Sequence, residues 1–285
     1  MHLRRLLPAF LLFFCAGLNI ATAETPEARL AALGIELPEV PAAIANYVQG
    51  SRRMLDRLEE LHRIQLAKSV DPVLETRIAQ YEMAFRMQAR APELIDLSRE
   101  SQQVLDDYGV EPGKPSYAAN CLMARRLVER GVRFVQLYHT NWDHHGGPTE
   151  NLEKHLPEVT REIDRPTVAL LDDLERRGLL DETIVVWGGE FGRTPVSQGG
   201  RDGRDHNPHA CTMWMAGAGV RTGLRYGRTD DYGYYAIENK VHFHDVHATL
   251  LHLLGLDHER LTWRHAGRDF RLTDIAGRVV HDILG

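Results

Sequence analysis

The chain has 285 residues, of which 43% are hydrophobic and 26% are charged, and its formal net charge is -6. A chain of this length can form one large domain or two small ones around a sizeable core. The charge is spread without a basic tail or stripe, so we expect no nucleic-acid partner. Three cysteines are too few for a fold built on disulfides.

The N-terminus has the pattern of a secretory signal. Arg4-Arg5 precedes an apolar run from Leu6 to Ile20, and Ala21-Thr22-Ala23 has the small-x-small form of a cleavage site. We therefore predict a signal peptide over residues 1–23, removed before Glu24, and a periplasmic or secreted mature protein. The apolar run is shorter than a spanning helix requires, so no membrane span is expected after cleavage. The arginine pair leaves both the twin-arginine and the general export route open.

The mature chain is predicted to begin with a helical part. Residues 24–43 contain three prolines and no sustained period, which indicates a lead-in segment. A domain is then predicted over residues 44–285, with its helical part at 44–107 and its α/β part at 116–285. Apolar residues recur at helical spacing over residues 44–66 and again after Pro72, which predicts an αα-hairpin. A helical scaffold that binds a partner is a third functional hypothesis, and it rests on this hairpin alone.

The second part alternates strands and helices. A helix is predicted from Tyr117 to Arg130, ended by Gly131, and β-branched and aromatic residues predict a strand over 132–138. The elements that follow are a helix over 151–177 that Pro166 could kink, strands at 183–187 and 211–216, and a helix over 246–254 capped by His244 or Asp245. The strand–helix–strand unit predicts that strands 132–138 and 183–187 are parallel neighbours. The predicted fold class is α/β, with a mostly parallel sheet flanked by helices.

Two cysteines remain after the predicted signal. Cys121 falls in a helical pattern, and Cys211 opens a strand pattern. They could form one disulfide in an oxidising compartment, or they could be free thiols in the core.

Polar, glycine-flanked loops accompany the predicted strands. His139 and residues 142–147 follow the first strand, residues 188–195 follow the second, and residues 203–209 precede the third. Sites in open α/β sheets form at the carboxyl ends of the strands, so these loops should meet at one edge. Thirteen of the fifteen histidines lie at or beyond His139. Imidazole and carboxylate together suit Zn, Mn or Fe, which favours a metal or catalytic site.

Other polar side chains near these loops have two interpretations each. Arg193 and Arg204 could bind a phosphate or sulfate oxyanion, or form surface ion pairs such as one between Arg204 and Asp205. His242 and His244 lie on one face if their segment is extended, so they could supplement the metal site.

Four motifs carry a resemblance to a known family. They are the run from Arg125 to Gln136, Trp142-Asp143, the run from Gly189 to Pro195, and the run from Gly203 to Pro208. With the run from His244 to Leu256 and the ending Gly267-Arg268-Asp269-Phe270, the chain resembles, from about Ser51 to its end, the sulfatase-like family named domain of unknown function 1501. That family is similar in its core to the alkaline phosphatase superfamily.

The resemblance implies an alkaline phosphatase-like core, a metal site and an ester substrate. It implies that Asp143, His145, Glu190 and His206 hold a divalent ion (Zn, Mn or Ca, the number left open), while Arg193 holds the nonbridging oxygens of a small anionic ester. The implied activity is an exported metal-dependent hydrolase of phosphate or sulfate esters. Second-tier candidates are His144, Asp205, Arg204, His209, His242 and His244.

Several features depart from the superfamily pattern. Glu190 is followed by Phe191 where an Asp followed by His is usual, and Asp143 and His145 are closer in sequence than the usual pair. Residues 24–50 contain no strand followed by an Asp or by a Ser/Thr nucleophile, so the first strand or strands of the core could be missing. Thr194 is the one hydroxyl within the site motif, and it is also typical of a turn before Pro195. The alternative function is therefore a catalytically inactive sulfatase-like binding module that lacks the nucleophile.

Overall fold

The computed structural model describes residues 9–15, 49–50, 52–61, 64, 80–82, 93–197 and 202–285. The chain divides into two compact units, one formed by Met1–Asn19 with Glu100–Gly285 and the other by Ile20–Arg99. The predicted lead-in, residues 24–43, lies outside the described residues.

The smaller unit is helical where it is described. Residues 52–61 and 80–82 are in helices, and a 3-10 helix, η1, spans Leu97–Arg99. Arg52 on the first segment pairs with Asp56, at 2.9 Å, and with Glu82 on the second, at 3.2 Å. Helix is thus confirmed in these parts of the predicted hairpin and at residues 49–50 and 64, and its other residues lie outside the described ones.

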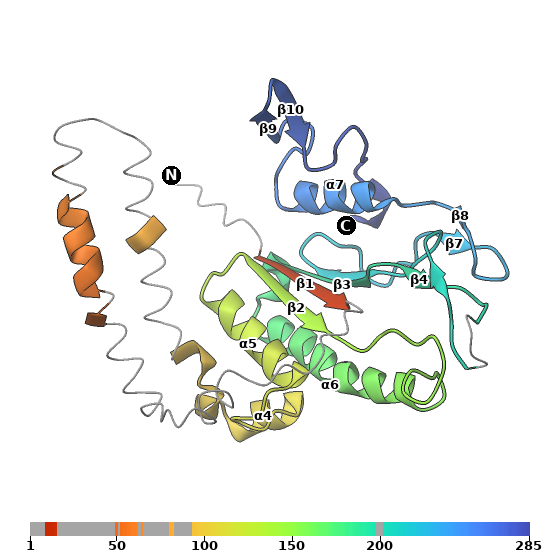
Figure 1. Ribbon diagram of the computed structural model, residues 1–285, viewed down its shortest axis with the longest axis horizontal. Helices are drawn as coiled ribbons and strands as arrows, with labels where there is room; N and C mark the ends of the chain where they lie inside the picture. The colour runs from red at the N-terminus through yellow and green to blue at the C-terminus, as the bar shows by residue number, and fades with distance from the viewer. Residues whose placement is uncertain are drawn as a thin grey trace. The chain divides into compact units, whose positions relative to one another are not determined.

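The larger unit is built on a four-stranded sheet in the order β2-β1-β3-β6 (Figure 1). Its strands are β1 (Ala9–Cys15), β2 (Phe134–His139), β3 (Thr183–Gly189) and β6 (Trp214–Gly217). β1 runs parallel to both β2 and β3, whereas β6 pairs antiparallel with β3. The prediction of a mixed helix-and-strand fold is confirmed.

The position of β1 corrects the predicted strand order. Strands β2 and β3 were expected to be neighbours, but β1 lies between them and pairs with both. Residues 9–15 lie within the predicted signal peptide. A short apolar run fits the core of a signal and a buried strand equally well, because both need only a stretch of apolar residues.

The other sheets are small and antiparallel. They pair β4 (Gly192–Arg193) with β5 (His206–Asn207), β7 (Arg228–Thr229) with β8 (Ala236–Glu238), and β9 (Thr262–His265) with β10 (Arg268–Arg271). Together with the antiparallel β6, they limit parallel pairing to the three strands β2, β1 and β3 among the described residues. The described residues between β3 and β6 include no long helix, and antiparallel neighbours need no crossover helix.

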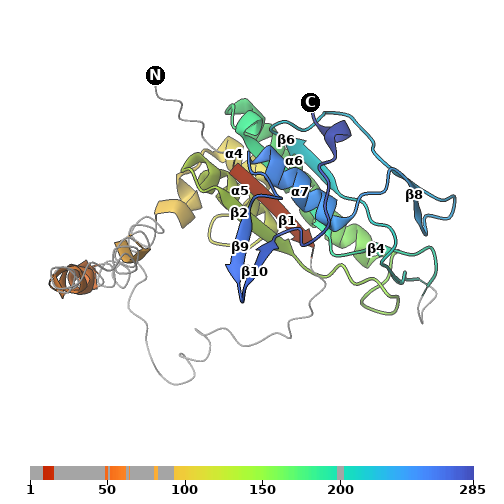
Figure 2. The same ribbon diagram turned by 90° about the horizontal axis from the view of Figure 1, so that it is seen from above.

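Helices cover both faces of the four-stranded sheet. The helices α4 (Gln102–Tyr108), α5 (Tyr117–Glu129) and α6 (His155–Arg176) pack together, and α5 and α6 lie on one side of the sheet (Figure 1). On the other side, α7 (Phe243–Leu253) crosses the sheet, as the view from above shows (Figure 2). Leu250 of α7 packs against Ile184 and Val186 of β3. Because β3 is covered on both faces, it is a continuous apolar run rather than an alternating one.

The predicted ends of α5 agree with the structure within one residue, but α6 begins at His155 rather than at residue 151, and α7 begins before residue 246. Ser116 caps α5 by accepting a hydrogen bond from the backbone of Ala119, and α6 continues through Pro166. The expected caps of α7 were His244 or Asp245, but the N-cap is His242, and Asp245 completes a capping box from the first turn. The helix begins earlier than predicted because Asp245 can accept from the His242 backbone N–H, at 2.9 Å.

A buried ion network joins the helices of the larger unit. The guanidinium of Arg125 on α5 contacts Glu100 at 2.7 Å, Glu129 at 2.6 Å and Asp173 of α6 at 3.0 Å. The Nε atom of Arg125 is within ion-pair distance of Asp173 but is not aligned for a hydrogen bond. The Tyr108 hydroxyl of α4 donates to Asp173 as well, at 3.2 Å. This network links three helices beneath the surface.

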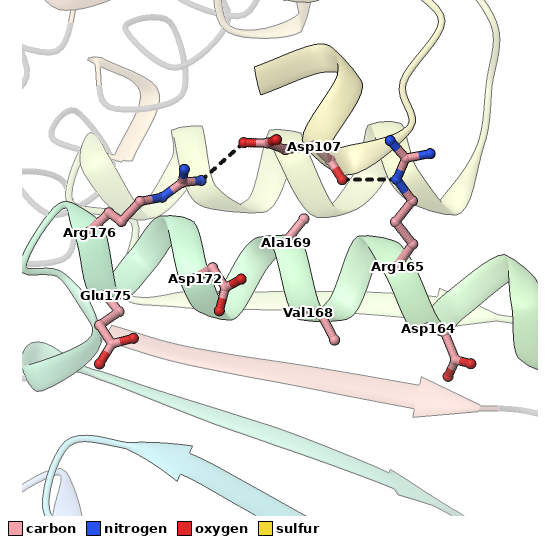
Figure 3. A pocket seen from close by; sticks show the side chains of 8 residues that line it. All are labelled: Asp107, Asp164, Arg165, Val168, Ala169, Asp172, Glu175 and Arg176. Atoms are coloured by element: carbon pink, nitrogen blue, oxygen red, sulfur yellow. Dashed lines mark hydrogen bonds and ion pairs between the residues drawn. The ribbon is translucent and has the colours of Figure 1, made fainter. Parts of the chain in front are cut away.

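An open hollow lies between α4 and α6 (Figure 3). Asp107 of α4 contacts α6 at two points beside this hollow. Its carboxylate pairs with Arg176 at 3.3 Å, and its backbone oxygen accepts a hydrogen bond from Arg165 at 3.1 Å. The acidic residues Asp164, Asp172 and Glu175 extend from the other side of α6 (Figure 3). These contacts tie the two helices together.

Cys121 and Cys211 are both free thiols, so the disulfide interpretation is wrong. Cys121 is buried in α5, and burial raises the pKa of its thiol to about 12, while Cys211 is exposed. Among the described residues, no helix combines the length and the apolar character needed to cross a membrane.

Candidate metal centre

The candidate site lies where β2 and β3 end. The loop after β2 carries Asp143 and His145, and the small β4–β5 ribbon that follows β3 carries Arg193 and His206. Arg193 and His206 are direct partners in that antiparallel pair, so their backbones are adjacent. The ribbon therefore brings residues that are 13 positions apart in the sequence against the loop after β2.

Three possible ligand atoms meet at this point. Asp143 Oδ1 lies 2.8 Å from His145 Nε2 and 3.2 Å from His206 Nε2. The two imidazole Nε2 atoms are 2.9 Å apart. One carboxylate oxygen and two imidazole nitrogens thus form a triangle, the one group of potential metal ligands found among the described residues.

Arg193 holds the carboxylate of the triangle from one side. Its guanidinium donates to Asp143 Oδ1, at 3.2 Å and 3.3 Å, and to the backbone oxygen of Trp142, at 2.9 Å. Burial raises the pKa of Asp143, but the hydrogen bonds from His206 and Arg193 and the nearby positive charge outweigh it and hold that pKa below its usual range. Asp143 is therefore ionised at neutral pH and available as an anionic ligand.

Aromatic side chains support the ligands. The ring of Phe191 packs on the ring of His206 with centroids 4.0 Å apart. The Arg193 guanidinium lies 5.6 Å from the centre of the Phe191 ring. On the other side, the Trp142 indole donates to His139 Nδ1, at 2.9 Å, and His139 Nε2 lies 3.0 Å from Glu162 of α6. Phe191 was noted in the sequence only as a departure from a family pattern. Its position two residues before Arg193 was the available signal of this supporting role.

Close backbone contact explains one glycine of the site. A side chain at Gly203 would lie 2.0 Å from the backbone of His145, so only glycine fits there. The adjacent Arg204 backbone donates to the carbonyl of His144, at 2.8 Å. The loops that carry His145 and His206 are thus fixed to each other through their backbones.

The remaining primary candidates lie outside the triangle. Glu190 follows β3 directly and is half-buried, but it is not a member of the group of ligand atoms. Thr194 is buried, and its hydroxyl donates to the backbone oxygen of Val196, at 3.0 Å, and accepts from the same residue's N–H. The Thr194 hydroxyl is therefore engaged in a turn.

The second-tier candidates mostly have structural contacts. Asp205 accepts from the backbone of His206, at 2.8 Å, and the Arg204 guanidinium donates to the backbone of Gly203, at 2.6 Å. No ion pair between Arg204 and Asp205 occurs among the described residues. The others are distributed as follows: His144 is buried beside Trp142, His209 packs on Tyr234 and Tyr235, and His242 caps α7 with its ring against His244.

One nitrogen of the site has no partner in the structure. His145 Nδ1 is buried and makes no hydrogen bond with any described residue. Metal-bound histidines usually donate this second ring N–H to an oxygen, which fixes the tautomer. The orientation of the His145 ring therefore depends on its contacts with Asp143 and His206 in the triangle.

The fold and the cluster define a mixed helix-and-strand protein with a histidine–carboxylate triangle at the edge of its main sheet. Residues 37–284 match the family described as "Protein of unknown function (DUF1501)", and the chain belongs to that family. No curated protein and no solved structure matches the chain.

Proposed function

We propose that the protein is an exported, metal-dependent hydrolase of phosphate or sulfate esters. The observation that carries the proposal is the triangle of Asp143, His145 and His206, whose ligand atoms are 2.8 to 3.2 Å apart. For tetrahedral Zn with bonds of about 2.0–2.1 Å, neighbouring ligand atoms would be roughly 3.3 Å apart. The donor set and its spacing therefore fit a divalent ion such as Zn or Mn, and Ca remains a third candidate.

Charge balance also supports a cation in the triangle. Two imidazole nitrogens and a carboxylate oxygen all have lone pairs, and three such atoms facing one another need protons or a metal ion between them. Asp143 already receives hydrogen bonds from Arg193, which leaves its carboxylate ionised. A bound divalent ion would polarise the ester and stabilise the attacking and leaving oxygens.

Arg193 is the residue proposed to bind the substrate anion. Its side chain is partly exposed beside the triangle, and a guanidinium can hold two oxygens of a phosphate or sulfate. The two Nη atoms already contact Asp143 and the Trp142 carbonyl. The arginine would therefore orient both the ligand carboxylate and the nonbridging oxygens of the ester.

One observation favours the second candidate, an inactive binding module. Thr194 is the hydroxyl nearest in sequence to the site residues, and it is buried in a turn with Val196 rather than directed to an ester. A module of this kind would bind a metal ion and an anion without transferring the phosphoryl or sulfuryl group. Both candidates share the metal triangle, so metal content is the first quantity to measure.

The test measures metal in the purified protein by elemental analysis and then ester hydrolysis on the same samples. The wild type is compared with a double variant, Asp143→Ala/His206→Ala, and with His265→Ala as a control that removes an exposed imidazole from the distant hairpin strand β9. We expect a stoichiometric divalent ion in the wild type and the control, and its loss in the double variant. Metal without turnover would favour the binding module, and a wild type free of metal after incubation with Zn, Mn or Ca would contradict both candidates.

The N-terminal pattern supports the exported location that this proposal includes. Arginines, an apolar run and a small-x-small sequence are the three parts of a secretory signal.

A further inference from the structure

Strand β1 is one of the two internal strands of the main sheet and lies between β2 and β3. It pairs with β2 at six positions, from Phe10 to Cys15, and with β3 at seven, from Ala9 to Cys15. Both ladders are parallel and follow one continuous register without an interruption. No other strand of this sheet pairs along its length with two parallel neighbours.

Removal of β1 would leave a gap that β2 and β3 cannot close by small shifts. Neighbouring strands lie about 4.8 Å apart, so strands on either side of a third are separated by roughly 9.6 Å. The facing N–H and C=O groups of β2 and β3 would lose their partners along the whole gap. Ile184, Val185 and Val186 of β3 are fully buried, which places these backbone groups inside the protein, where a missing hydrogen bond destabilises the fold most.

The same strand sets the spacing of the candidate site. Cys15 at the end of β1 pairs with His139 at the end of β2 and with Gly189 at the end of β3. The loop to Asp143 and His145 begins on one side of β1, and the segment to Glu190 and the β4–β5 ribbon begins on the other. The distance between the two halves of the site therefore depends on a strand being present between them.

The predicted signal peptide and strand β1 share the same seven residues. As a cleaved signal, residues 1–23 would leave the protein, and as β1, residues 9–15 are the centre of its sheet. We propose that residues 9–15 remain in the folded protein and occupy the position between β2 and β3, so that the apolar N-terminal segment is a structural strand in the final protein. A chain that begins at Glu24 would then have an open strand-acceptor groove instead of a complete sheet.

Hydrogen exchange on the full-length wild-type protein tests the proposal without a substitution. Peptides that cover residues 9–15 and 183–189 are followed by mass spectrometry under native conditions. We expect the amides of β1 to exchange as slowly as those of β3, because hydrogen bonds to two neighbours protect a central strand. Exchange in residues 9–15 at the rate of an unstructured chain would overturn the proposal.

A pair of proline variants separates the strand from a general effect on the apolar segment. Leu12→Pro removes a backbone donor from the middle of β1, whereas Leu18→Pro makes the same replacement beyond the end of β1. We expect Leu12→Pro to lower the melting temperature by roughly 6–12 °C or to abolish the cooperative transition, and Leu18→Pro to have little effect. Equal melting temperatures for the two variants would contradict a central strand.

The intact mass of the folded protein, purified from a host that exports it, gives a third readout. We expect the fraction with a cooperative thermal transition to retain residues 9–15. A folded protein that starts at Glu24 and melts at the same temperature as the full chain would show that the sheet is complete without β1. Each of these measurements is independent of metal binding, so it tests the strand even if the hydrolase proposal fails.

Discussion

The protein contains two polar clusters that differ in the balance between positive and negative groups. Around Arg125, three carboxylates, from Glu100, Glu129 and Asp173, pair with three arginines, Arg125, Arg126 and Arg177. In the candidate metal centre, two imidazoles and one carboxylate face one another at an open edge of the sheet, and Arg193 reaches only the carboxylate. The first cluster is complete within the protein, whereas the second has more acceptors than cations and therefore has room for a positive ion.

The comparison predicts that the two clusters respond differently to mutation. Substitution in the Arg125 network should reduce stability and leave metal binding unchanged, because it would leave a buried charge without its partner. Substitution in the metal centre should do the reverse, since its residues are partly exposed and support few buried groups. The predictions below follow this contrast from the largest effect to the smallest.

The largest effect is expected for Asp173→Ala. Asp173 and Arg125 are both almost fully buried, so the substitution leaves a buried guanidinium without one of its counter-charges and removes the acceptor of Tyr108. We expect the free energy of unfolding to fall by about 3–5 kcal/mol. Urea denaturation measures this change, and metal content should remain that of the wild type.

The control for this variant is Asp172→Ala. Asp172 is the adjacent residue of α6, but its side chain extends into solvent (Figure 3). Exposed substitutions of this kind usually change stability by less than about 0.5 kcal/mol. A similar loss of stability in both variants would mean that the buried network is not the source of the effect.

A smaller effect, on affinity rather than stability, is expected for Phe191→Ala. The phenyl ring packs on His206 and lies beside the Arg193 guanidinium, so its loss frees the imidazole to rotate away from Asp143. Residues that orient metal ligands typically contribute about 10- to 100-fold to metal affinity. We expect a weakening of this order for Zn or Mn, measured by competition with a chelator.

Phe270→Ala provides the matched control for the site phenylalanine. Phe270 on β10 also has an arginine over its ring, Arg268 at 4.5 Å, but its aromatic partner is His265, which is not part of the triangle. Its replacement should leave metal affinity unchanged. Equal weakening in the two variants would show that Phe191 does not act through His206.

The sequence predicted the residues of the triangle but not the Arg125 network. The three ligands of the triangle could be proposed because polar loops at the ends of strands converge, and because the family resemblance points to the same positions. The Arg125 network gave no such signal. Except for Glu129, which is four residues from Arg125, its members are distant in the sequence, and a charged residue on an amphipathic helix usually faces solvent.

The fold was predictable where local pattern decides the structure. The helical pattern ended by Gly131 predicted α5, and the β-branched residues predicted β2 and β3 to within a few positions. Strand β1 and the direction of β6 depend on pairing between distant segments, which a local pattern does not encode. Glu190 shows the same limit in the site, because its place directly after β3 does not determine where its carboxylate lies.

The smallest effect is expected at the start of α7, and it should depend on pH. Burial raises the pKa of Asp245, but the backbone N–H groups of His242 and Arg278 and the charge of Arg278 outweigh it, so the net shift is downward. A carboxyl whose pKa is lower in the folded state stabilises the protein above its unfolded pKa of about 3.9, and this contribution is lost as the pH falls through the folded value.

Asp245→Asn should therefore reduce stability by about 1 kcal/mol at pH 7, a typical contribution of a helix cap, and by less at pH 3. Urea denaturation at both pH values measures the difference, with the exposed Asp231→Asn as control. A loss that is the same at pH 7 and pH 3 would mean that the shape of the Asp245 side chain, and not its charge, holds the first turn of α7.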